Sequence, residues 1–117
     1  MVVIIGGRCH GKLSFIENYT KNGIINNYHL LIDKHQSFLT YTMDNLNELS
    51  NKIIIVEEIG LGIVPLESSL RSKRDELGRV YQFLCSKADV VIRVWYGIPI
   101  YIKGDEEALK KKLINII

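Results

Sequence analysis

The chain has 117 residues, 47% of them hydrophobic and 24% charged, with a net charge of +2 at pH 7. This composition is typical of one globular domain spanning 1–117, and the small net charge gives no argument for a nucleic-acid or membrane-surface partner. No apolar run approaches the roughly 20 residues that a membrane helix needs. Without a basic leader or cleavage site, the chain is expected to be cytoplasmic.

Apolar runs and helical periodicity alternate along the chain. The apolar runs predict buried strands at 1–5, 28–32, 53–56, 89–95 and 98–102. Helices are predicted at 12–22, 35–49 and 65–87, and after an Asp105 cap to about Ile114. Because only the last two strands are joined by a short turn, we expect an α/β domain. Its sheet should be mostly parallel, covered on both faces and closed by a C-terminal strand pair.

A glycine-rich segment joins the first predicted strand to the first predicted helix. It reads Gly6-Gly7-Arg8-Cys9-His10-Gly11-Lys12-Leu13. This matches the phosphate-binding pattern G-x-x-x-x-G-K-[ST] as far as Lys12. Backbone N–H groups in such a loop surround the phosphates, and the lysine adds a positive charge. We therefore expect Gly6 to Leu13 to bind GTP or ATP; the alternative is a glycine-rich turn with an incidental lysine.

Leu13 departs from the pattern at the position of the hydroxyl that normally binds Mg²⁺. A leucine side chain cannot bind a metal, and Ser14 points about 100° further round the helix. Phosphate binding is expected despite this change, whereas Mg²⁺ binding stays open. Phosphoryl transfer depends strongly on Mg²⁺, so Leu13 also argues against catalysis.

Acidic residues follow two of the predicted strands. Asp33 follows the run 28–32, and Glu57-Glu58 follow the run 53–56. In an open α/β sheet, ligands bind at the edge formed by the carboxyl ends of the strands. Asp33 and Glu58 are therefore candidates to hold a metal or orient a nucleophile. The alternative is that these acidic residues simply begin loops.

The segment after the third predicted strand is more specific. It reads Val-Glu-Glu-Ile-Gly-Leu-Gly-Ile-Val-Pro over 56–65 and continues with Arg71, Arg74-Asp75 and Gly78-Arg79. With the phosphate loop, it resembles the bifunctional adenosylcobinamide kinase / adenosylcobinamide-phosphate guanylyltransferase family of cobalamin biosynthesis. There a strand ends in Asn-Glu before Val-Gly-x-Gly-Ile-Val-Pro, and an Arg-x-x-Arg-Asp-x-x-Gly-Arg helix follows. The glutamate is kept as Glu58, and the resemblance covers 53–103 as well as the loop.

The resemblance implies a three-layer P-loop NTPase-like fold and a kinase that transfers a phosphoryl group from GTP or ATP to a corrinoid hydroxyl. Lys12 would be catalytic together with Glu58, which is also the metal candidate, and Asp33. The family's guanylylated histidine lies in a stretch that is missing here between the first helix and the run 28–32. Neither His29 nor His35 matches it, so this chain resembles a shortened member and guanylyl transfer is poorly supported.

Two other interpretations stay open. One is a catalytically reduced nucleotide-binding protein that acts as a regulatory or scaffold subunit, which Leu13 and the missing stretch favour. The other is a structural protein with a vestigial site and no nucleotide affinity. The intact loop and Glu58 favour the enzyme.

A homo-oligomer is also expected, and the resemblance implies a trimer. A chain this small and this hydrophobic leaves apolar surface outside its core. The segment from Trp95 to Ile102 is almost entirely apolar, and at a sheet edge it would favour contact with another subunit. The alternative is that the C-terminal helix covers it within one chain.

Overall fold

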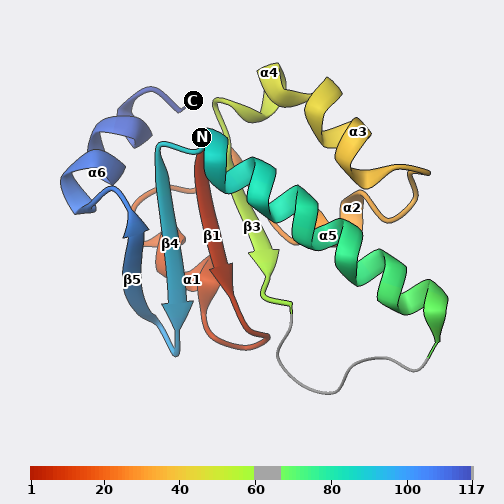
Figure 1. The fold of residues 1–117 in the computed structure, drawn as a ribbon. Helices are drawn as coiled ribbons and strands as arrows, with labels where there is room; N and C mark the ends of the chain where they lie inside the picture. Colours follow the sequence, from red (N-terminus) through yellow and green to blue (C-terminus); the bar gives the residue numbers. More distant parts are fainter. Residues whose placement is uncertain (60–66, 117) are drawn as a thin grey trace.

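The computed structural model describes residues 1–59 and 67–116 (Figure 1). In chain order the elements are β1 (Val2–Gly6), α1 (Lys12–Glu17), β2 (Ile24–Ile25), α2 (Tyr28–Leu31), α3 (Phe38–Asp44), α4 (Leu46–Leu49), β3 (Ile53–Glu57), α5 (Ser68–Lys87), β4 (Val90–Trp95), β5 (Ile98–Lys103) and α6 (Glu106–Ile114).

The strands form one sheet in the order β2-β3-β1-β4-β5. β1 pairs in parallel with both β3 and β4, and β2 pairs in parallel with β3. Only β4 and β5 are antiparallel. The prediction of a mostly parallel sheet with a C-terminal strand pair is therefore confirmed.

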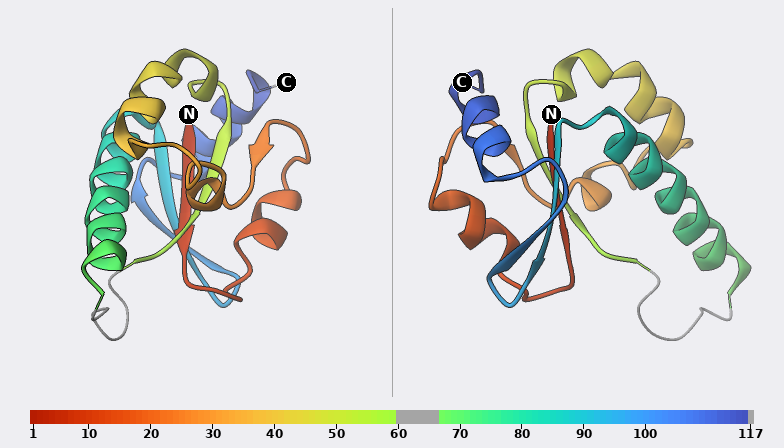
Figure 2. Two further views of the ribbon diagram at one scale, coloured as in Figure 1. Left: turned by 90° about the vertical axis from the view of Figure 1, so that its right-hand side faces the viewer. Right: turned by 60° about the vertical axis from the view of Figure 1, so that its left-hand side comes forward.

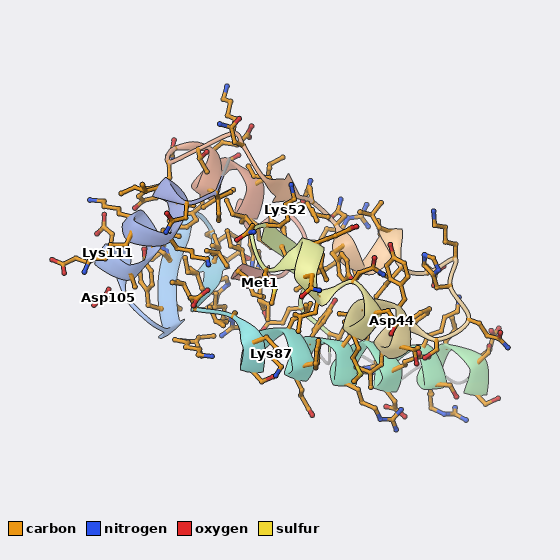
Figure 3. The ribbon with its side chains drawn as sticks, turned by 90° about the horizontal axis from the view of Figure 1, so that it is seen from above. Met1, Asp44, Lys52, Lys87, Asp105 and Lys111 are labelled. Atoms are coloured by element: carbon orange, nitrogen blue, oxygen red, sulfur yellow. The ribbon has the colours of Figure 1, made fainter. Side chains whose placement is uncertain are left out.

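Helices cover both faces of the sheet, which gives three layers (Figure 2). α3 and α5 lie on one face, and α1 and α6 lie on the other, as the view from above shows (Figure 3). Side chains of β1 alternate between the two resulting cores: Val3 packs toward Leu84 of α5, and Ile4 packs toward Leu109 of α6. Because both faces are buried, the central strands read as continuous apolar runs rather than as alternating patterns.

The prediction of a strand at 28–32 is wrong, because these residues form α2. Tyr28 and Ile32 are buried, whereas Leu30 and Leu31 are 64% and 54% exposed, which is the spacing of a helix face. The place in the sheet beside β3 is taken by the two residues of β2. A five-residue run such as 28–32 is too short for the period of its apolar residues to distinguish a strand from a helix.

Two of the predicted helices have limits in the structure that differ from those predicted. The helix predicted over 12–22 ends at Glu17. The helix predicted over 35–49 is two shorter helices, α3 and α4, which meet at Asn45. The Asn45 side chain donates to the carbonyl oxygen of Tyr41 at 2.8 Å. The same carbonyl also accepts the backbone N–H of Asn45 at 3.1 Å, so Asn45 ends α3 with two bonds to one acceptor.

The remaining helix predictions agree better with the structure. Asp105 caps α6 by accepting the N–H of Ala108 at 2.8 Å, as expected. The long helix is observed from Ser68 to Lys87, and its predicted start at Pro65 lies outside the described residues. Tyr81 and Leu84 are buried on the face of this helix that packs against the sheet, whereas Leu70 is 48% exposed.

Candidate functional site

The glycine-rich segment forms the predicted strand-turn-helix. β1 ends at Gly6, and α1 begins at Lys12. Gly11 has a φ of 83°, a left-handed backbone that favours glycine. A Cβ atom at Gly6 would lie only 2.5 Å from the carbonyl oxygen of Val94, so the loop must leave β1 through a glycine. The spacing of the two glycines therefore follows from the geometry of the turn.

Lys12 folds back over this loop. Its Nζ atom donates to the carbonyl oxygens of Gly7 at 2.8 Å and Gly6 at 3.1 Å. Burial lowers the pKa of the ammonium, while the nearby carboxylates of Glu57 and Glu58 act in the opposite direction. An anion in the loop would offer stronger acceptors than these two carbonyl groups.

A hollow of 210 Å³ lies beside the loop. It is lined by Cys9, Gly11, Lys12, Leu13, Ser14, Asn26 and Asn27. The two asparagines follow β2, and sequence reasoning missed them because it treated the next residues as a strand. Asn-Asn between two apolar runs was the available signal, since asparagine is a turn residue. Its side-chain amide is also a donor suited to phosphate oxygens.

Glu58 lies at the sheet edge as expected. Its backbone N–H donates to the carbonyl oxygen of Gly6 at 2.8 Å, which places it beside the start of the loop. Its carboxylate pairs with Arg93 of β4, with Oε1 at 3.1 Å from Nε. Arg93 was missed, although a charged residue within an apolar strand is a signal that could have found it.

Glu57 makes a second polar cluster at the same edge. Its N–H donates to Nδ1 of His29 at 3.3 Å, and its Oε2 lies 3.4 Å from Nε2 of the same ring. Tyr81 donates its hydroxyl to the Glu57 carbonyl at 2.7 Å. Burial lowers the pKa of His29, although Glu57 acts against this shift. Both ring nitrogens of His29 are thus engaged by one residue, which suits a positioning role.

Asp33 follows α2 rather than a strand, so the reason for expecting it at the sheet edge does not hold. Its carboxylate pairs with Lys73 of α5 at 3.2 Å, and both side chains are about half exposed. Glu57 and Glu58 are the carboxylates that act on Lys12.

A magnesium ion would find few protein ligands here. Within 1–59 and 67–116, no group of three or more His, Cys, Asp or Glu side chains is placed to hold a metal. Leu13 lines the hollow where the pattern places a hydroxyl. Mg²⁺ is often bound by one or two carboxylates, water and substrate phosphates. The residues present fit only that kind of site, with Glu58 as a candidate carboxylate.

The motif residues of α5 lie along two other hollows. The larger, of 530 Å³, is lined by Ser68, Arg71, Ser72, Arg74 and Asp75. The neighbouring one, of 400 Å³, is lined by Ile59, Arg74, Asp75, Gly78, Arg79 and Gln82. The described α5 residues that carried part of the sequence resemblance therefore line two neighbouring hollows, whereas residues 60–65 of that motif lie outside the described residues. No helix in the described part of the chain is long and apolar enough to cross a membrane.

Comparison with known proteins agrees with the resemblance. Residues 14–102 match the model of the family described as cobinamide kinase / cobinamide phosphate guanyltransferase. A relative is the bifunctional adenosylcobalamin biosynthesis protein CobP of Pseudomonas aeruginosa, which is 36% identical over 64 residues. That alignment spans 54% of this chain and 37% of the relative. The family match begins just after Lys12, so the glycine-rich loop is assigned from its own sequence and geometry. With more than half of its length matched, the chain belongs to the cobinamide kinase / cobinamide phosphate guanyltransferase family.

Proposed function

We propose that this chain binds a nucleoside triphosphate at Gly6 to Leu13 and transfers a phosphoryl group from GTP or ATP to a corrinoid hydroxyl. The observation that carries the proposal is the strand-turn-helix loop with Lys12 above it and Glu58 beside its start. Family membership supports the substrate class.

The roles follow from charge and position. Loop N–H groups and the Lys12 ammonium would hold the phosphates and stabilise charge that develops during transfer. Glu58 would orient either the acceptor hydroxyl or a water molecule on Mg²⁺. A bound Mg²⁺ would neutralise negative charge on the phosphates. Asp33 stays a weaker candidate, because it pairs with Lys73.

A second candidate function is that of a regulatory or scaffold subunit that binds nucleotide but has little phosphoryl-transfer activity. Leu13 favours it, because the loop lacks the hydroxyl that would help to hold Mg²⁺. Guanylyl transfer is not part of our proposal, because His29 is engaged by Glu57 through both nitrogens. A homo-oligomer, with a trimer as the form implied by the family resemblance, completes the proposal.

Calorimetric titration with GTP and ATP, with and without Mg²⁺, tests the site. Charge-assisted hydrogen bonds contribute about 1.5–3 kcal/mol, so Lys12→Ala should weaken binding roughly tenfold or more. Lys110→Ala is the matched control, because it removes one exposed lysine of α6. Equal affinity of wild type and Lys12→Ala would rule out this site.

Transfer is measured separately, with labelled nucleotide and cobinamide as acceptor. Phosphorylated corrinoid would support the kinase. Binding without transfer would favour the subunit of reduced activity.

A further inference from the structure

The turn between β4 and β5 carries an unusual residue. Trp95 pairs with Ile98, so the hairpin has the two-residue loop Tyr96-Gly97. Tyr96 and Gly97 have φ values of 50° and 79°. A turn with two left-handed residues is normally built from Asn, Asp or Gly, since a bulky side chain is disfavoured there. Tyr96 occupies this position although its side chain is 72% exposed and gains little from burial.

The turn is fixed to the phosphate loop. The N–H of Gly97 donates to the carbonyl oxygen of His10 at 2.7 Å. The ring centroids of His10 and Tyr96 are 4.5 Å apart, with a tilt of 39° between the planes. The β4–β5 turn and the loop after β1 lie side by side in Figures 1 and 2. An exposed aromatic ring therefore lies at the rim of the loop.

Trp95 extends this aromatic surface. Its ring centroid lies 5.9 Å from that of Tyr96, and it is 51% exposed. Beyond its contacts with His10 and Trp95, Tyr96 stays exposed in a left-handed position that disfavours a bulky side chain. A residue kept for ligand binding would look like this.

We propose that Tyr96 stacks on the base of the nucleotide whose phosphates the loop holds. This inference rests on the proposed nucleotide site. Stacking suits any nucleobase, because every base has an aromatic face, so Tyr96 would add affinity for GTP and ATP alike. It would add nothing for a ligand made of phosphates alone.

The test compares GTP, ATP and inorganic tripolyphosphate. Tyr96→Asn removes the ring and supplies the Asn-Gly pair that this turn favours, so the hairpin is kept. Tyr96→Phe is the matched control, because it keeps the ring. Given the usual contribution of base–aromatic stacking, Tyr96→Asn should weaken both nucleotides by at least about fivefold. The affinity for tripolyphosphate should stay within twofold of wild type, and Tyr96→Phe should behave as wild type.

Trp95 supplies a second measurement, because the chain has one tryptophan. Nucleotide should quench its fluorescence in the wild type, and tripolyphosphate should not. Unchanged nucleotide affinity in Tyr96→Asn would overturn the stacking, and so would an equal loss for nucleotide and tripolyphosphate, which would mean that Tyr96 only positions the loop. Wild type that binds neither ligand would overturn the nucleotide site itself and the stacking with it.

Discussion

Glu58 and Arg93 face each other across the end of β1, with Oε1 of the carboxylate 3.1 Å from Nε of the guanidinium. Glu58 follows β3 and Arg93 lies on β4, so β1 separates the strands that supply the pair. The ion pair holds the proposed acceptor-orienting carboxylate beside the start of the phosphate loop.

We expect this pair to stabilise the fold. Both side chains are only partly exposed, so the coupling should fall between those of surface and buried pairs, at roughly 1 kcal/mol. A double-mutant cycle with Glu58→Gln and Arg93→Gln, measured by urea unfolding, gives this coupling free energy directly. Additive effects of the two substitutions would contradict the expectation.

The His29–Glu57 contact predicts a pH dependence of stability. Burial lowers the pKa of His29 in the folded protein below its ordinary value of 6.5. In that range the unfolded chain binds more protons, so the free energy of unfolding should fall as pH decreases from 6.5 toward the lower folded value. His29→Gln should show a weaker dependence on pH than wild type. Identical pH profiles would contradict the prediction.

The strands at the centre of the sheet were predictable because their burial on both faces produces a continuous apolar run in the sequence. β1 and β3 are buried on both faces, so each reads as an unbroken apolar run. α2 was not predictable in this way, because Leu30 and Leu31 on its exposed side are as apolar as the buried Tyr28. The place beside β3 that a strand at 28–32 would have taken is occupied by β2.

In the candidate site, too, some residues could be predicted from the sequence and others could not. The loop from Gly6 to Lys12 was predicted because its glycine and lysine spacing is local. Arg93 lies near Glu58 because of the strand order β3-β1-β4. Asn27 lines the same hollow as the loop because a turn follows β2. Contacts that depend on the order of strands in the sheet produce no fixed spacing in the sequence, so a motif search does not find them.

Leu13 predicts weak dependence of nucleotide binding on Mg²⁺. Leu13→Ser restores the hydroxyl of the phosphate-loop pattern, so Mg²⁺ should strengthen nucleotide binding more in this variant than in wild type. Leu13→Ala removes the same side chain without adding a ligand and is the control. Titrations with and without Mg²⁺ measure the difference, and equal enhancement in all three proteins would show that Leu13 does not limit metal binding.

A further expectation is that no covalent guanylyl intermediate forms on a histidine. The resemblance supplied no match for the family's nucleophile, and the ring of His29 is engaged by Glu57. Incubation with GTP labelled in the α-phosphate, followed by denaturation, should leave the protein unlabelled. Label retained on His29 or His35 would show that guanylyl transfer occurs here.

The last prediction concerns the assembly. β5 forms one edge of the sheet, and Tyr101 packs on the face that α6 covers. The neighbouring residues Ile98, Ile100 and Ile102 are 65%, 44% and 62% exposed, so α6 leaves these side chains uncovered.

An apolar strand edge of this kind favours contact with another subunit, and we expect an oligomer at micromolar concentration. Light scattering measures the mass. Ile100→Lys should shift the protein toward the monomer, because a charge at the contact would lose its water. Ile114→Lys is the matched control, since Ile114 is an isoleucine of α6 that is 80% exposed and is not part of β5. A clean monomer mass for the wild type would reject the oligomer and leave β5 as an exposed edge of a single chain.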